Sequence, residues 1–122
     1  MKRLTGLAVL IILVIAFGIG CSKQVFNGNR TSNDKQFIMN YTILNREETQ
    51  NLKLYEGTTV NVNIENKSGK LKVLVTDSRG EEIYRADNAA TGKFSIQISK
   101  TDSYKFSVTG KKANGGVSFK VE

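Results

Sequence analysis

The chain has 122 residues, a formal net charge of +7, one cysteine, and no histidine, tryptophan or proline. A chain of this length holds one domain and is too short for two. The lack of histidine removes the commonest general base and metal ligand, and a single cysteine excludes an intramolecular disulfide. Catalytic and metal-dependent functions therefore have few of the residue types that they usually need.

The N-terminal stretch has the order of an export signal. Lys2 and Arg3 precede an apolar run over residues 4–19, for which we expect a helix over 4–17. A retained transmembrane helix is the alternative, but a span needs roughly 20 apolar residues and this run has about 16 with a glycine-rich end. We therefore predict a signal peptide over residues 1–20. Its removal lowers the net charge from +7 to +5, because Lys2 and Arg3 leave with it.

The only cysteine follows this run directly. Gly18-Ile19-Gly20-Cys21 resembles the lipobox of bacterial lipoproteins. In that family a diacylglyceryl group is attached to the cysteine sulfur, and the signal is cut before the cysteine. The resemblance implies lipidation of Cys21 and a protein held by lipid on the extracytoplasmic side of the cell membrane.

Residues 21–36 are predicted to be the lipidated cysteine and a flexible tether. Asn, Ser, Gly and charged residues dominate this segment, in which Val25 and Phe26 are the apolar residues after Cys21. A flexible chain of such composition has a mean reach of about 20 Å, enough to lift a small domain from lipid headgroups. The alternative is that Val25 and Phe26 form a binding epitope.

From residue 37 onward apolar and polar residues alternate with a period of two, which is typical of half-buried strands. We expect about eight strands, over residues 37–43, 52–54, 60–64, 71–75, 81–85, 94–98, 104–108 and 117–121. Turn signals separate them at intervals of roughly 8 to 12 residues. This pattern predicts an all-β domain over residues 37–122, an antiparallel jelly-roll-like β-sandwich.

Three connections carry turn chemistry. Residues 66–69, Asn-Lys-Ser-Gly, are predicted to close a hairpin between strands 60–64 and 71–75. Residues 77–80, Asp-Ser-Arg-Gly, suit a type I turn. Residues 110–116 are predicted to be a glycine-rich loop.

Ten side chains occupy the apolar phase of these strands and are expected to point inward. They are Val62, Ile64, Leu71, Val73, Val75, Phe94, Ile96, Tyr104, Phe106 and Phe119.

The spacing of core and turn residues over residues 50–122 carries a resemblance. Leu52-x-Leu54-x-x-Gly57, Tyr104-x-Phe106-x-Val108 and Val117-x-Phe119 look like small bacterial lipoproteins, whose domain is similar to GOLD and bacterial pre-peptidase C-terminal domains. Asp102 stands two residues before the tyrosine, where such domains usually carry Gly. The resemblance implies a binding or accessory module.

Catalytic and metal-binding constellations are sparse. Ser95 and Ser107 alternate with core positions, so we expect both to be surface hydroxyls. Asp77, Glu81 and Glu82 lie near one turn and could pair for glycoside hydrolysis or bind calcium, but turn chemistry and a solvated strand start are the favoured interpretation. No catalytic residue, metal or cofactor is predicted.

The lysines allow two interpretations. Many alternate with core positions, namely Lys53, Lys70, Lys72, Lys93, Lys105 and Lys120, and Lys111-Lys112 lies in the glycine-rich segment. They protect strand edges and keep the domain soluble, or they attract anionic lipid headgroups or wall polymers, with Lys70, Lys72, Lys111 and Lys112 as the candidates. Nucleic acid is not an expected partner, because no basic run is interleaved with aromatic residues.

Two functions follow from these patterns. The first is a membrane-anchored, extracytoplasmic, non-catalytic binding or structural module at the cell envelope. The alternative is a small extracytoplasmic hydrolase or inhibitor. A cleft with converging carboxylates would favour the enzyme, and a closed sandwich would favour the module.

Overall fold

The computed structural model describes residues 23–122. They form β1 (Val25–Asn33), β2 (Gln36–Asn45), β3 (Glu47–Leu54), β4 (Thr59–Thr76), β5 (Glu82–Ala86), β6 (Gly92–Gln97) and β7 (Asp102–Val121). Neighbouring strands pair antiparallel, which confirms the predicted all-β class. The predicted signal peptide over 1–20, with its helix over 4–17, and Cys21 lie outside the described residues. Within residues 23–122 no helix could span a membrane.

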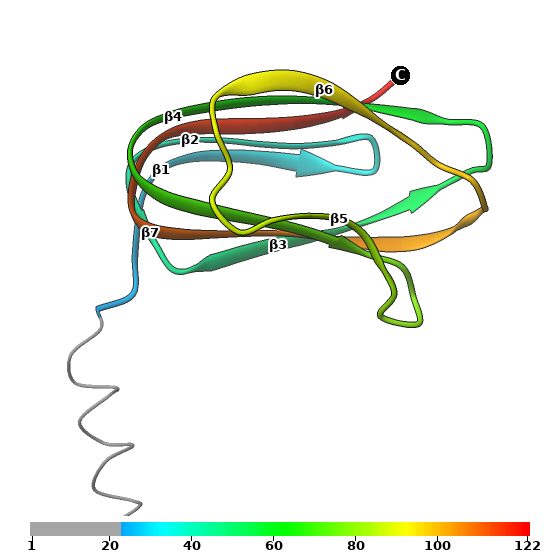
Figure 1. The fold of residues 1–122 in the computed structure, drawn as a ribbon, viewed down its shortest axis with the longest axis horizontal. Helices are drawn as coiled ribbons and strands as arrows, with labels where there is room; N and C mark the ends of the chain where they lie inside the picture. Colours follow the sequence, from blue (N-terminus) through cyan, green and yellow to red (C-terminus); the bar gives the residue numbers. More distant parts are fainter. Residues whose placement is uncertain (1–22) are drawn as a thin grey trace, which may run out of the picture.

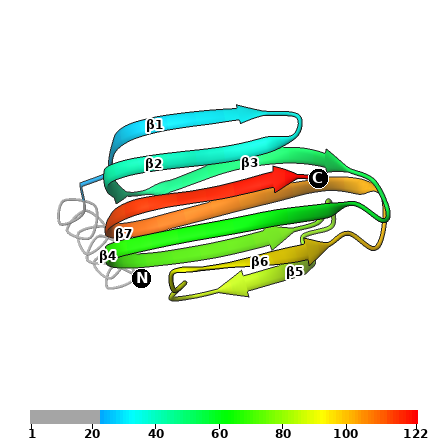
Figure 2. The same ribbon diagram turned by 90° about the horizontal axis from the view of Figure 1, so that it is seen from above.

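Two long strands, β4 and β7, build both layers of the sandwich (Figure 1). Residues 60–66 of β4 pair with residues 115–121 of β7 in one layer, and residues 70–76 pair with residues 105–111 in the other. The first layer is completed in the order β1-β2-β7-β4-β6, and we call it the five-stranded sheet. The second has the order β3-β7-β4-β5 and is called the four-stranded sheet. Figure 2 looks down onto the five-stranded sheet.

The hairpin predicted at residues 66–69 and the loop predicted at 110–116 are both wrong. Both segments continue through the strand, β4 and β7 respectively, and bend together from one layer into the other. Gly69 and Gly115 have positive φ values of 76° and 147°, which lets the two backbones turn without breaking off their pairing. The same residue types favour a turn and a bend, so the sequence pattern does not separate them.

The flexible tether predicted to reach residue 36 is also wrong. Val25–Asn33 is a strand that pairs with β2 from Val25↔Asn45 to Asn33↔Gln36. Phe26 is half-buried and packs against the core, so the alternative of a Val25-Phe26 epitope also loses its basis. An edge strand has few apolar neighbours to cover, and its sequence therefore lacks the alternation that marks the inner strands.

Arg30 of β1 closes one side of the sandwich by joining the two layers. Its guanidinium forms an ion pair of 2.6 Å with Glu48 of β3 and donates hydrogen bonds to the Thr49 carbonyl (2.5 Å) and the Gln50 side chain (3.0 Å). It also lies 4.6 Å from the ring centroid of Phe37. The side chain thus contacts β3 and the buried face of β2 together.

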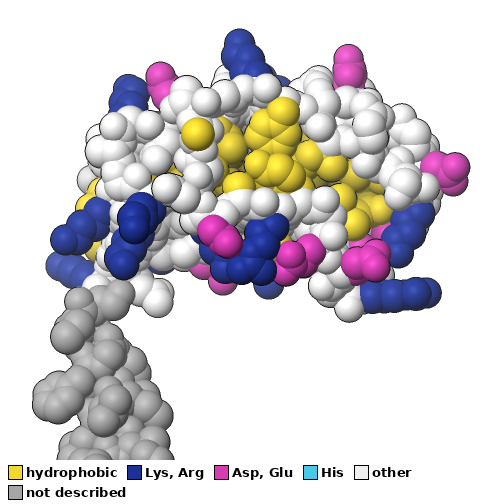
Figure 3. Space-filling view, viewed as in Figure 1, with side chains coloured by type: hydrophobic (Ala, Val, Ile, Leu, Met, Phe, Trp, Pro, Cys, Tyr) yellow, Lys and Arg dark blue, Asp and Glu magenta, His cyan; other side chains and the backbone are white. Residues whose placement is uncertain are grey.

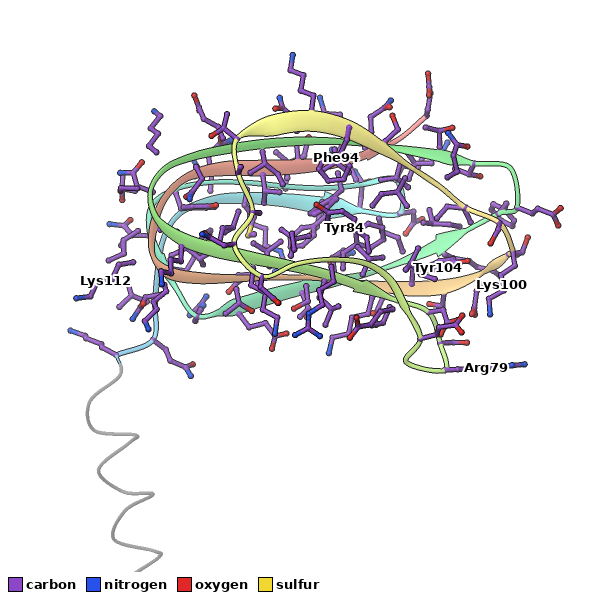
Figure 4. All side chains as sticks on the ribbon, viewed as in Figure 1. Arg79, Tyr84, Phe94, Lys100, Tyr104 and Lys112 are labelled. Carbon is purple, nitrogen blue, oxygen red and sulfur yellow. The ribbon has the colours of Figure 1, made fainter. Side chains whose placement is uncertain are left out.

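The opposite side, between β5 and β6, is closed by aromatic contact instead. Tyr84 of β5 and Phe94 of β6 lie with ring centroids 4.9 Å apart, and both rings are half-buried. Figure 4 shows the two rings between the layers, and Figure 3 shows apolar surface along this side.

The core agrees closely with the predicted inward side chains. Nine of the ten are buried: Val62, Ile64, Leu71, Val73, Val75, Ile96, Tyr104, Phe106 and Phe119. Phe94 is half-buried, because it lies at the edge of the sandwich between β5 and β6. Val73 is fully buried.

Val73→Asp should prevent folding. The substitution places a carboxylate without a partner in the core, at a cost of several kcal/mol against a total stability of about 5 to 15 kcal/mol. Circular dichroism should show no cooperative thermal transition. The matched control is Asn61→Asp on the exposed face of the same strand, which should melt close to wild type. A cooperative transition of Val73→Asp near that of wild type would contradict the inward register.

Arg30→Ala should destabilise the sandwich by about 1 to 3 kcal/mol in urea denaturation, because it removes one of the two arginines paired with the largely buried Glu48 carboxylate, leaving Arg46, and also removes the hydrogen bonds to Thr49 and Gln50. Arg85→Ala is the control, since Arg85 pairs with exposed carboxylates at the other edge and its loss should matter much less. If both substitutions lowered the free energy of unfolding by equally small amounts, Arg30 of β1 would not help to hold the two layers together.

Candidate functional site

Five exposed lysines gather at the end of the sandwich where β4 and β7 bend. They are Lys23, Lys67, Lys70, Lys111 and Lys112, and we call this surface the basic end. The pairing of β4 with β7 sets Lys70 directly opposite Lys111. Figure 4 shows Lys112 at this end and Lys100 at the other.

Hydrogen bonds bring the first described residue to the same end. The backbone N–H of Lys112 donates to the side-chain oxygen of Asn45 at 2.9 Å. The side-chain N–H of the same Asn45 donates to the carbonyl of Lys23 at 2.6 Å. Asn45, the last residue of β2, therefore ties the start of the described chain to the bend of β7.

The backbone geometry of the bend permits little besides glycine. A Cβ on Gly69 would lie 2.1 Å from the carbonyl oxygen of Lys112, and a Cβ on Gly115 would lie 1.9 Å from that of Glu65. Lys112 itself has a φ of 51°, which is uncommon for a residue with a side chain. The close approach of the two backbones is what brings lysines about 40 residues apart in sequence together.

The lysines of the basic end are not paired with carboxylates. Within residues 23–122, none of the five takes part in an ion pair, although Glu65 borders the same hollow as Lys67. Lys70 and Lys111 face each other as a like-charge pair, which disfavours folding by up to about 1 kcal/mol. An anionic surface would relieve this repulsion, so the cluster is suited to bind one.

The structure places three of the four predicted contact lysines at the basic end. It brings Lys70, Lys111 and Lys112 together, whereas Lys72 lies opposite Thr109, further along the outer face of the four-stranded sheet. Sequence reasoning missed Lys23 and Lys67. Lys67 was in the segment interpreted as a hairpin turn, and Lys23 was in the supposed tether, so neither had a predicted position next to the others.

The two candidate nucleophiles lie in different environments. Ser95 is exposed and donates a hydrogen bond to the side chain of Asn61 at 3.1 Å, as expected of a surface hydroxyl. Ser107 is only 5% exposed, so its prediction as a surface hydroxyl is wrong. It donates a hydrogen bond to Glu47, and the strands on either side cover its small side chain. The hydroxyl group is thus used within the fold.

Asp77 forms the predicted turn, with Gly80 N–H donating to its carbonyl at 3.0 Å, but its side chain is buried rather than solvated. The carboxylate accepts hydrogen bonds from the N–H groups of Arg79 and Glu81, both at 2.9 Å, and forms an ion pair of 3.0 Å with Lys100. Lys100, followed by the Glu81 N–H, lowers the pKa of Asp77. This carboxylate holds a turn and has no free oxygen aimed at a substrate.

Asp102 fixes the same turn to the start of β7. Its carboxylate accepts hydrogen bonds from the hydroxyl (2.8 Å) and the N–H (3.2 Å) of Ser78, and the hydroxyl contact is the main cause of its lowered pKa. Glu81 and Glu82 are exposed. In the part of the chain from residue 23 onward, no three His, Cys, Asp or Glu side chains are grouped to hold a metal ion.

The chain matches no protein-family model and no curated protein sequence. Its fold is similar to that of periplasmic inhibitors of g-type lysozyme, named PliG. The Aeromonas hydrophila protein has 14% identity and a TM-score of 0.49, with coverage of 80% of this chain and 88% of that one. The Salmonella Typhimurium protein has 15% identity and a TM-score of 0.42, with coverage of 82% and 92%.

A third similar structure is TmCBM61 in complex with β-1,4-galactotriose. It has 20% identity and a TM-score of 0.41, with coverage of 78% of this chain and 66% of that one. All three TM-scores are below 0.5, so nothing about function follows from these similarities. The resemblances to the lipobox and to GOLD and pre-peptidase C-terminal domains stay predictions.

Asp77→Asn should destabilise the protein in a pH-dependent way. Because folding lowers the pKa of Asp77, the carboxylate contributes stability above the unfolded pKa of about 4, and this contribution is lost as the pH falls through the folded pKa. Urea denaturation should therefore separate wild type from Asp77→Asn at pH 7, and less so at pH 3. Asp34→Asn, in the exposed β1–β2 turn, is the control. A gap between wild type and Asp77→Asn that does not change with pH would contradict this account.

Proposed function

We propose that this chain is an extracytoplasmic lipoprotein, anchored through Cys21, whose sandwich is a non-catalytic binding or structural module that rests on an anionic surface of the cell envelope. The observation that carries the proposal is the position of the basic end. The basic end includes Lys23, which lies two residues after Cys21, the predicted lipid attachment site, and is held beside Lys112 through Asn45. Anchor and charge would then act on the same surface.

The distance between anchor and sandwich supports this arrangement. β1 begins at Val25, four residues after Cys21, and four residues span at most about 14 Å. This connection is shorter than the tether expected from the sequence. Lys23, two residues after Cys21, would lie within about 7 Å of the anchor, which is less than one Debye length of roughly 8 to 10 Å, so the basic end would be held near the headgroups.

The energy of such contact is modest for each lysine. A basic group near an anionic membrane contributes about 1 kcal/mol. Three or four engaged lysines would give an affinity of about millimolar without the anchor. Anchoring raises the effective concentration, which makes so weak an interaction sufficient to orient the domain.

Lys111→Gln/Lys112→Gln should weaken binding to anionic vesicles. A soluble form starting at Ser22 is mixed with vesicles of phosphatidylglycerol and phosphatidylcholine, and the bound fraction is measured by flotation. The double substitution should lower binding by about tenfold or more, and about 0.5 M salt should nearly abolish it, because the Debye length falls to about 4 Å. Phosphate-rich wall polymer, tested in a parallel arm, distinguishes the two sources of negative charge.

The matched control is Lys93→Gln/Lys120→Gln, which removes the same charge from the outer face of the five-stranded sheet. Equal losses in the two variants would show that net charge alone matters and would contradict a basic end that docks. Salt-independent binding, or none to either surface, would also contradict it. Mass spectrometry of the mature N-terminus tests the anchor separately, since an unmodified Cys21 behind an intact leader would exclude lipidation.

A further inference from the structure

The outer face of the five-stranded sheet is rich in side-chain amides. Strand register and alternation place Asn29, Asn33, Gln36, Asn40, Asn61 and Asn63 on this face, in neighbouring rows across β1, β2 and β4. The hydroxyls of Thr31 and Ser118 lie between them, and Ser95 lies beside Asn61 on the edge strand β6. Lys93, Lys120 and Glu65 share this face. Figure 2 looks down onto this face.

The outer face of the four-stranded sheet has a different composition. Its outward positions hold one carboxamide, Asn51, and five lysines: Lys53, Lys70, Lys72, Lys105 and Lys111. Either set of side chains would keep a sheet soluble, so solubility does not explain the difference. Asn is disfavoured in strands, and the amides therefore work against the fold that carries them. Such a departure, confined to one face, indicates a binding role.

Several of these amides are free to bind a ligand. The side chains of Asn29, Asn40 and Asn63 are exposed and form no hydrogen bond with any other described residue. Asn45 and Asn66, at the bend, instead use their side chains to hold the backbone. The amides of the outer face thus keep both a donor and an acceptor available.

Adjoining hollows connect the amides into a groove. A hollow of about 460 Å³ near Lys93 shares Asn63 and Ser118 with one of about 100 Å³, which in turn shares Asn40 and Glu65 with one of about 310 Å³. Together they run diagonally from β6 to β1. Four strand spacings give this groove, which we call the amide groove, a width across the sheet of about 19 Å.

Gly116 forms the floor at the centre of the amide groove. It pairs with Asn40 on one side and Glu65 on the other, so no side chain fills the space between them. A Cβ at this position would lie 2.7 Å from the side-chain oxygen of Asn40. The carboxamide of Asn40 therefore lies across the glycine, at the point where two hollows meet.

We propose that the amide groove binds a hydroxyl-rich glycan chain. A carboxamide offers a donor and an acceptor side by side, which matches neighbouring sugar hydroxyls, and a groove of this length suits a polymer rather than a small molecule. A protein partner would need aromatic, Met or Arg anchors, whereas Ile38 is the apolar side chain among these rows. A site without an aromatic platform binds weakly, with a dissociation constant of about millimolar.

This binding goes beyond the proposed function, because it does not need the lipid anchor or the charge of the basic end, from which Lys67 alone borders one hollow of the groove. It is tested with the full chain in neutral detergent micelles, using hexamers of β-1,4-linked N-acetylglucosamine and of β-1,4-linked glucose as probes. Two-dimensional NMR should show shifts in the side-chain amide signals of Asn40 and Asn63 and in the backbone signal of Gly116. The signals of Asn51, on the other face, should not move.

Asn40→Ala/Asn63→Ala should weaken binding at least fivefold, and Asn51→Ala should leave it unchanged. The dispersion of the spectra shows directly whether each variant is folded, and the wild-type shift map tests the proposal even if one variant is not. Absence of shifts with both hexamers at about 20 mM would overturn the proposal. Shifts centred on the four-stranded sheet, or stronger shifts with an extended peptide of similar length, would overturn it as well.

Discussion

The close backbone contact between the bends of β4 and β7 is the constraint on which the other features depend. At Gly69 and Gly115 the backbones approach so closely that a Cβ would lie about 2 Å from a carbonyl oxygen of the other strand. Both strands therefore change layers at the same place and stay paired. The paired strands β4 and β7 therefore contribute to both sheets, and the remaining strands pair along their edges.

This constraint also decides where charge gathers. The bend presents lysines of both strands at one end of the sandwich, and Asn45 holds the start of β1 against them. The sides of the sandwich are closed by other means, with Arg30 between β1 and β3 and the Tyr84–Phe94 contact between β5 and β6. Neither closing contact uses the lysines of the basic end, so these stay available to an anionic surface.

Under the two proposals, the basic end and the amide groove have different roles. The strands run away from the basic end, so a domain that rests on this end would hold both sheets upright from the membrane (Figure 1). The amide groove would then open sideways, where a polymer of the envelope can pass along it. Charge would set the orientation through long-range attraction, and neutral amides would set recognition through hydrogen bonds.

The sequence by itself determined the fold class, nine of the ten inward side chains and the turn at Asp77, because period-two alternation and turn chemistry are local signals. It did not determine β1, whose polar edge lacks alternation, nor distinguish a bend from a hairpin at residues 66–69. It also indicated Lys70, Lys111 and Lys112 but not their neighbours Lys23 and Lys67. Only the tertiary structure decided which lysines meet and which amides share a face, because cross-strand register depends on contacts between residues far apart in the chain.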